Sequence, residues 1–336
     1  MWMMSLKQTS LRCGLFIIGL PLLGLLYQNI TNMLEARRYP PPGELIDVGG
    51  HRLHIYSVGQ QGQGPTVVLE AGLSCSHLDW CKVQPEVAKF ARVCSYDRTG
   101  LGWSETGPST RSSSQMVTEL HQLLTNANIP GPYILVANSF GGFIVRLYAD
   151  QYPQEVAGLV LVDVSHEDQL SLPFVGQGIK ASLWVFALSS LLAPFGLARL
   201  AIHLGLSHHY LIKYPPAIRP LLKVAWGKTQ WLKTAYKELA TFRECADQIR
   251  AHQHAYAHLP LIVLSQRLPA KSSSRAEKQV AQKWQMLQQD LANQSSQGRK
   301  ILAKHSGHYI QLDQSELVIE AIKSIFQATM ARDRRH

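Results

Sequence analysis

Short apolar runs alternate with helical patterns along most of this chain. Runs such as Val67–Glu70, Val93–Tyr96 and Leu159–Val162 are short and largely apolar, which is typical of strands buried on both faces. Met116–Ala127 instead repeats its apolar positions with the period of a helix. Strands and helices that alternate in this way predict an α/β fold with a mostly parallel, doubly wound sheet and helices on both faces.

The beginning of the domain has a different pattern. Leu45–Val48 and Arg52–Val58 alternate polar and apolar residues around a Gly-Gly pair, which predicts an opening β-hairpin. Two further strand-like runs stand near the end of the chain, at Leu261–Leu264 and Ile301–Ala303.

Nearly a hundred residues between Asp163 and Pro260 interrupt this rhythm. They contain an apolar stretch from Ala181 to Leu206 and a segment from Tyr210 to Tyr236 that carries Trp and Tyr. An insertion of this length between two strands predicts a helical lid over residues 164–259. We expect at least half of its apolar residues to form the lid's own core and the surplus to line an apolar pocket.

An uncharged stretch near the N-terminus covers residues 13–34. At about 1.5 Å per residue it is long enough to cross a bilayer as a helix. A cleavable signal peptide is the alternative, but no small-x-small cleavage site follows, so the sequence favours an uncleaved single-pass membrane anchor. Positive charges flank both ends and leave its orientation open. A Pro-rich spacer then separates residues 1–42 from the domain, predicted as residues 43–163 and 260–331.

The charge of the chain is positive, with 33 Lys and Arg against 23 Asp and Glu, a formal net charge of +10. No basic stripe interleaved with aromatic residues occurs, so nucleic acid is not a predicted partner. The basic run at Arg332–Arg335 fits a solvated tail or an attraction to anionic lipid. The five cysteines lack metal-ligand spacing, and no metal or cofactor is predicted. Cys75 and Cys81 could pair, but nothing in the sequence requires it.

The stretch Tyr133–Gly142 carries the strongest chemical signal. An apolar, β-forming run leads into Ser139, and a helical pattern follows. Ala137 and Gly141, two residues before and after the serine, are small, as a sharp strand–turn–helix junction demands. This layout predicts a nucleophile elbow, with Ala in place of the first Gly of G-x-S-x-G. The five-residue pattern alone also fits a simple Ser/Gly turn that starts a helix.

Further motifs stand before and after the Ser139 elbow: Glu70-Ala71-Gly72-Leu73, Tyr96-Asp97-Arg98 with Gly100-Leu101-Gly102-Trp103-Ser104, Leu161-Val162-Asp163 and Ser306-Gly307-His308. In this order they resemble the α/β-hydrolase superfamily over roughly residues 43–331. The chain is most similar to the lid-bearing branch of serine hydrolases with an N-terminal membrane segment. The resemblance implies the α/β-hydrolase fold and a triad in the chain order nucleophile, acid, histidine.

His308 is the predicted base among the fourteen histidines. A serine hydroxyl needs a base to accept its proton near neutral pH. His308 lies just after the last strand, in a Ser-Gly-His turn where the family places its base. His305, three residues earlier, is the neighbouring alternative. His203 and His208 lack the spacing of a zinc-binding helix, which agrees with the absence of a predicted metal.

The predicted acid is Asp163. Relatives commonly carry it after the penultimate strand, but here residues 265–276 contain no carboxylate. Asp163 ends the preceding strand, where the family also allows the acid, and it would orient the histidine. Glu167, Asp168 and Asp290 remain alternatives. Asp97 precedes Ser139 against the family's order, so we expect it to organise its loop through an ion pair with Arg98 or other local hydrogen bonds.

Two backbone N–H groups are expected to stabilise a developing oxyanion: that of Phe140, which follows the nucleophile, and that of Leu73. Together these features predict a serine hydrolase that cleaves carboxylic esters with apolar acyl or alcohol groups. An amide or peptide hydrolase and a thioesterase or acyltransferase remain alternatives on the same fold. A catalytically inactive binding module is the alternative from another class. The oligomeric state stays open.

Overall fold

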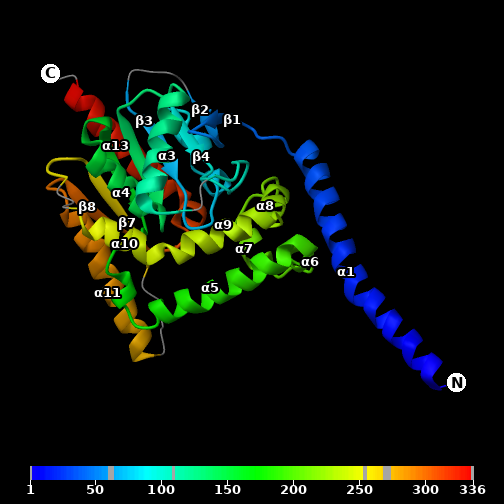
Figure 1. The fold of residues 1–336 in the computed structure, drawn as a ribbon. Helices are drawn as coiled ribbons and strands as arrows, with labels where there is room; N and C mark the ends of the chain where they lie inside the picture. Colours follow the sequence, from blue (N-terminus) through cyan, green and yellow to red (C-terminus); the bar gives the residue numbers. More distant parts are fainter. Residues whose placement is uncertain (1, 60–63, 108–109, 253–255, 268–273, 334–336) are drawn as a thin grey trace. The chain divides into compact units, whose positions relative to one another are not determined.

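The structure is a computed structural model that describes residues 2–59, 64–107, 110–252, 256–267 and 274–333 (Figure 1). In the first helix, side chains are described from Gly19 onward. The sheet has eight strands in the order β1-β2-β4-β3-β5-β6-β7-β8. The strands are β1 (Glu44–Asp47), β2 (Arg52–Val58), β3 (Thr66–Glu70), β4 (Val93–Tyr96), β5 (Tyr133–Asn138), β6 (Val156–Val162), β7 (Leu261–Gln266) and β8 (Gly298–Ala303).

The predicted strands and their directions agree with this sheet. β1 pairs antiparallel with β2, and β2 pairs antiparallel with β4, which gives the expected opening hairpin. All the other neighbours are parallel. The central strands β3 and β5 are buried along their whole length, as their continuous apolar runs predict.

Helices cover both faces of the sheet. The helices are α1 (Trp2–Arg38), α2 (Gln84–Val87), α3 (Ser113–Asn126), α4 (Gly141–Gln151), α5 (Val175–Leu192), α6 (Leu197–His203), α7 (His208–Leu211), α8 (Arg219–Trp226), α9 (Thr229–Ala240), α10 (Phe242–Arg250), α11 (Arg275–Asn293), α12 (Ile310–Asp313) and α13 (Ser315–Asp333), with 3-10 turns η1 (His77–Trp80), η2 (Pro153–Glu155), η3 (Gln169–Ser171) and η4 (Ala193–Phe195).

Two apolar cores separate the sheet from its two helical layers. On one face, buried side chains of α3, α4, α10 and α11 pack against alternate residues of the strands. On the other face, η1, α2, α12 and α13 supply the buried side chains. This is the mostly parallel, doubly wound architecture that the sequence predicts.

The chain forms two compact units. A sheet unit comprises Pro41–Leu183 and Thr234–His336, and a helical unit comprises Met1–Pro40 and Trp184–Lys233. Part of the segment expected as a lid, residues 164–183 and 234–259, therefore groups with the sheet. The reason for the second part is packing: α10 buries Phe242, Cys245 and Ile249 in the core beneath α3 and α4.

The helical unit contains the stretch expected as a membrane anchor. Residues 13–34 lie within α1, which is continuous from Trp2 to Arg38. Among the residues whose side chains are described, however, the helix long and apolar enough to cross a membrane is Val175–Phe195, which has 21 residues and a mean hydropathy of 1.4. The sequence prediction assigned this second apolar stretch to the lid alone.

Candidate active site

Ser139 lies at a sharp turn between β5 and α4. Its φ angle is +52°, a left-handed conformation that is unfavourable for a residue with a side chain and that concentrates at functional sites. The small residues around it are required by contact distances. A Cβ on Gly141 would lie 2.7 Å from the carbonyl oxygen of Ala71, and one on Gly142 would lie 2.4 Å from Cβ of Val164. Glycine at both positions therefore lets α4 start directly behind the serine.

Asp163 and His308 meet at the carboxyl ends of the strands. Asp163 follows β6 and is fully buried, and its Oδ2 lies 2.6 Å from Nδ1 of His308. The other carboxylate oxygen accepts hydrogen bonds from Nε1 of Trp284, at 2.8 Å, and from the backbone N–H of Gln266, at 3.0 Å. These donors fix the carboxylate, so the imidazole donates through Nδ1–H and keeps Nε2 as an acceptor.

The elbow lies close to this pair. Nδ2 of Asn138, the residue before the serine, is 3.5 Å from the carbonyl oxygen of His308, and the N–H of Ser165 donates to the carbonyl of Ser139 at 2.8 Å. Within the described part of the chain, no hydrogen bond joins the Ser139 hydroxyl to the His308 ring. Such bonds are often long in a free enzyme and shorten when substrate binds.

The backbone around Leu73 and Phe140 fits the expected oxyanion site. A Cβ on Gly72 would come within 3.3 Å of the Ser139 Cβ, so the loop after β3 approaches the elbow closely. Among the described residues, no backbone acceptor receives a hydrogen bond from the N–H of Leu73 or Phe140. Both donors are therefore free to bind an oxygen beside Ser139.

A buried arginine holds the loop that carries Leu73. Arg98 donates to the carbonyl oxygens of Ala71, at 2.8 Å, and Gly72, at 2.7 Å. Its guanidinium also pairs with Glu70, at 2.5 Å, and with Glu238 of α9, at 2.7 Å. Burial alone would lower the pKa of Arg98, but the two carboxylates raise it well above its usual range.

Glu238 also reaches the loop directly, because its Oε2 accepts the backbone N–H of Ser74 at 2.8 Å. Sequence reasoning gave no role to Glu238, which lies far along the chain within the expected lid. No local pattern distinguishes Glu238, and its contact with Arg98 is visible only in the folded chain.

Asp97 forms a separate buried network and does not pair with Arg98. Its carboxylate accepts hydrogen bonds from Nδ1 of His54 at 2.9 Å, Nδ1 of His77 at 3.0 Å and the N–H of Trp103 at 3.0 Å. Of the two uses expected for Asp97, the structure therefore has the local hydrogen bonds. His54, His77 and Asp97 are close enough to suggest a metal site. Nδ1 of each histidine already bonds to Asp97, and Nε2 of His54 accepts the N–H of Gly43.

The alternative acids have other partners. Glu167 pairs with the buried Arg146 at 2.7 Å, Asp168 with Arg250 at 3.0 Å, and Asp290 with His166 at 3.2 Å. Burial would raise the pKa of Glu167, but the hydrogen bond and charge of Arg146 lower it to about 2. None of these three carboxylates bonds to His308 within the described residues.

A cavity of about 590 Å³ opens beside His308. One wall comes from Leu172, Phe174 and Val175 at the start of the expected lid, and the other from Val280 and Trp284 of α11. Its volume falls within the usual range for small-molecule sites, and its walls are mostly apolar. Arg267 and Glu277 add charged groups at its edge. Many large apolar residues of the expected lid do not line this cavity. They are exposed to solvent instead, including Trp184 and Leu188.

None of the four cysteines whose side chains the structure describes offers a competing nucleophile, because burial raises the pKa of each thiol. Cys75, Cys81, Cys94 and Cys245 are free, so the pairing left open for the first two is not formed. Burial raises the pKa of the Cys94 thiol to about 12 and that of Cys245 to about 11. Neither thiol ionises appreciably near neutral pH.

The sheet order, the elbow after β5 and the His–Asp pair at the strand ends define an α/β-hydrolase fold. Residues 65–188 match the family model described as alpha/beta hydrolase fold. The chain therefore has the α/β-hydrolase fold.

Individual proteins are similar to this chain over most of its length, and the solved structures among them share its fold. The chain is 26% identical over 266 residues to the uncharacterized protein YqjL of Bacillus subtilis, which covers 79% of this chain and 85% of that protein. It superposes on the enol-lactonase of Burkholderia xenovorans with a TM-score of 0.60 at 15% identity, covering 84% of this chain and all of that one. A thermophilic esterase from Thermogutta terrifontis superposes with a TM-score of 0.60 at 19% identity. The superposition covers 85% of this chain and 98% of the esterase.

Proposed function

We propose that this protein is a membrane-anchored serine hydrolase that cleaves carboxylic esters with an apolar acyl or alcohol group. The observation that carries the proposal is the His308–Asp163 pair, 2.6 Å between Nδ1 and Oδ2, beside the strained turn at Ser139. The names of the structural neighbours, an enol-lactonase and an esterase, agree with this chemistry without establishing it.

The first half of the proposed reaction acylates Ser139. The hydroxyl attacks the ester carbonyl while Nε2 of His308 accepts its proton, and Asp163 stabilises the imidazolium that forms. The carbonyl oxygen becomes an oxyanion and receives hydrogen bonds from the N–H groups of Phe140 and Leu73. His308 then gives the proton to the departing alkoxide, so the alcohol leaves and the acyl group stays on Ser139.

The second half releases the acid. A water molecule transfers a proton to Nε2 of His308 as it attacks the acyl carbonyl, and the same oxyanion donors stabilise the intermediate. Collapse of this intermediate returns the proton to the Ser139 oxygen and frees the carboxylic acid. The reaction consumes one water, regenerates the enzyme and uses only groups of this chain.

The cavity beside His308 supports an apolar substrate. Val175, Val280, Ala281 and Trp284 line it, and they present carbon surface rather than hydrogen-bond partners along most of its length. A buried methylene contributes about 0.8 kcal/mol, which is about fourfold in kcat/KM while the chain still fits. We therefore expect kcat/KM to rise about fourfold per added CH₂ along a series of nitrophenyl esters, from acetate until the cavity is full.

The measurement is initial-rate hydrolysis of that series by the full-length protein. Val280→Asp provides the control, because a charge in the cavity wall should flatten the profile without touching Ser139, Asp163 or His308. A rate that stays level or falls from acetyl to octanoyl esters in the unaltered protein would contradict the apolar substrate class.

The proposed anchor is the helix α1. Arg199 of α6 is buried within the helical unit, and its guanidinium is held by Gln28, Asn32 and Glu35 of α1. Cleavage that removed α1 would take away these partners of Arg199 and expose the surface on which α1 packs. We therefore expect the N-terminal helix to remain on the mature protein.

Carbonate extraction of native membranes tests the anchor. The full-length chain should stay in the pellet, and its intact mass should include residues 13–34. A peripheral protein is released by the same treatment and serves as the control. Recovery of a mature chain that begins after residue 34 would identify the stretch as a signal peptide.

A further inference from the structure

The exposed large hydrophobic side chains are confined almost entirely to two stretches. All of those in the described part of the chain except Tyr236, Met286 and Leu302 belong to residues 20–34 of α1 or to residues 174–212. Monomeric soluble proteins rarely expose contiguous apolar patches above a few hundred Å². We call these two stretches the apolar surface.

Helix α5 is the clearest part of the apolar surface. The segment Val175–Phe195 has a mean hydropathy of 1.4, yet only 6% of the residues in its most apolar 18-residue stretch are buried. Trp184 is 79% exposed and Leu191 is 68% exposed. The helix that covers a sheet normally buries one apolar stripe, whereas α5 has no fully buried residue at all.

The exposed side chains of α1 continue this surface within the helical unit. A Cβ on Gly24 would lie 2.5 Å from the carbonyl oxygen of Phe195, and one on Gly196 would lie 2.6 Å from the Tyr27 ring. Such close approach packs α1 directly on η4. Together with the Arg199 cluster, it joins the proposed anchor and the segment after α5 into one structural piece.

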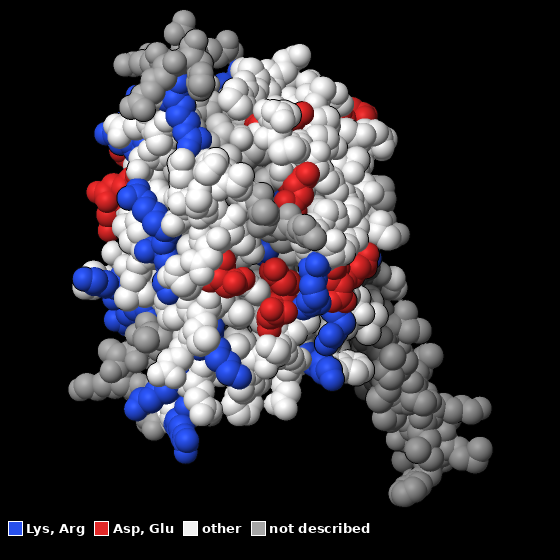
Figure 2. All heavy atoms as spheres, turned by 90° about the vertical axis from the view of Figure 1, so that its left-hand side faces the viewer, with Lys and Arg blue, Asp and Glu red and all other residues white. Residues whose placement is uncertain are grey.

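The charged residues from α5 to Lys237 are all basic. From Gln169 to Lys237 the sequence contains no Asp or Glu, but it contains eight Lys and Arg residues. Lys180, Lys223 and Lys233 are among those with exposed side chains. The face of the molecule drawn in Figure 2, by comparison, carries acidic and basic side chains side by side. Of these eight, Arg199 is buried and paired with Glu35. An apolar stretch followed by the exposed lysines is complementary to an anionic lipid layer.

We propose that the apolar surface is embedded in a lipid bilayer with anionic headgroups. The exposed side chains of α5, η4 and α6 enter the acyl region together with those of α1, and the basic residues of α8 and α9 meet the headgroups. The bilayer then removes from water the carbon surface that the chain itself leaves uncovered. This membrane contact does not depend on the proposed reaction. Of its exposed large side chains only Phe174 also borders the cavity beside His308, and the test alters none of the residues that line this cavity.

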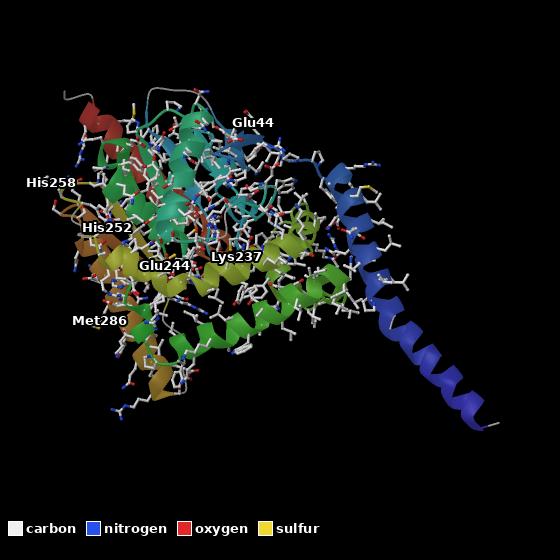
Figure 3. All side chains as sticks on the ribbon, in the orientation of Figure 1. Glu44, Lys237, Glu244, His252, His258 and Met286 are labelled. Carbon is white, nitrogen blue, oxygen red and sulfur yellow. The ribbon has the colours of Figure 1, made fainter. Side chains whose placement is uncertain are left out.

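The contact can be tested with a fluorescent label on the full-length protein in vesicles. Leu188→Cys on α5, 58% exposed, carries an environment-sensitive nitrobenzoxadiazole group, in a background in which Cys13, Cys75 and Cys81 are serine. Met286→Cys is the matched control, because Met286 is 69% exposed and projects from α11 of the sheet unit (Figure 3). Both replaced side chains are exposed, and circular dichroism checks that each labelled protein is folded.

The expected result is a blue-shifted emission at position 188, loss of quenching by aqueous iodide and strong quenching by lipids with a nitroxide on the acyl chain. The label at position 286 should still be quenched by iodide and should not be quenched by the nitroxide lipid. Phosphatidylglycerol in phosphatidylcholine vesicles should increase the nitroxide quenching at 188, and Lys223→Gln with Lys233→Gln should reduce that increase.

Three outcomes would overturn the proposal. Iodide quenching at 188 equal to that at 286 would place α5 in water. Protection from iodide without nitroxide quenching would mean that a second copy of the chain, not lipid, covers the helix. Equal nitroxide quenching at position 188 with and without phosphatidylglycerol would show that the contact has no preference for anionic lipid. Esterase assays do not enter this test, so it remains decisive even if the proposed reaction is wrong.

Discussion

Ser139→Ala is expected to remove ester hydrolysis by on the order of 10³-fold or more in kcat while leaving the protein folded. The hydroxyl is the only group at the elbow that can form the acyl-enzyme in the proposed reaction. The substitution removes a single oxygen, and alanine is no more strained than serine at the observed φ of +52°. The fold should therefore be retained while the covalent step is lost.

Two measurements make this prediction specific. Fluorophosphonate should label the unaltered protein stoichiometrically at Ser139 and should not label the variant. Ser324→Ala, a serine of α13 whose hydroxyl accepts a hydrogen bond from Arg299, is the matched control and should keep both activity and labelling. A Ser139→Ala protein that retains a tenth of the original turnover would show that the nucleophile is another residue.

The local pattern of the sequence was sufficient to predict the sheet. Short, largely apolar runs placed β3, β4 and β6 within three residues of their observed bounds, because strands buried on both faces are apolar along most of their length. The elbow was equally readable, since steric demands at the turn select small residues beside Ser139. Such features depend on residues that are close together in the chain, so they can be recognised in a single sequence.

The features that could not be predicted from the sequence depend on contacts between residues far apart in the chain. Glu238 reaches Arg98 across 140 residues, and Trp284 donates to Asp163 across 121 residues. Neither residue has a local pattern that distinguishes it from an ordinary surface Glu or a core Trp. The surroundings of the exposed apolar residues of the expected lid could not be predicted for a related reason. Hydrophobicity indicates that a helix avoids water, but it does not distinguish a pocket, a protein core or a lipid layer as its surroundings.

Asp163→Asn is expected to lower kcat by on the order of 10³–10⁴-fold with little change in folding. The carboxylate holds Nδ1 of His308 at 2.6 Å and is itself held by Trp284 and the backbone of Gln266. Asparagine keeps the size of the side chain but can turn its NH₂ group toward the ring. That contact favours the tautomer with the proton on Nε2, which cannot accept a proton from Ser139.

The alternative carboxylates supply the controls that decide the assignment. Asp290→Asn alters a residue whose side chain is 64% exposed and which bonds to His166, so activity and stability should both remain close to those of the unaltered protein. Glu167→Gln removes the charge opposite the buried Arg146, so it should lower the stability by roughly 1.5–3 kcal/mol. Turnover per folded molecule should nevertheless be preserved in that variant. Rates measured with thermal unfolding curves separate the two effects. Greater loss of kcat in either control than in Asp163→Asn would move the triad acid away from the end of β6.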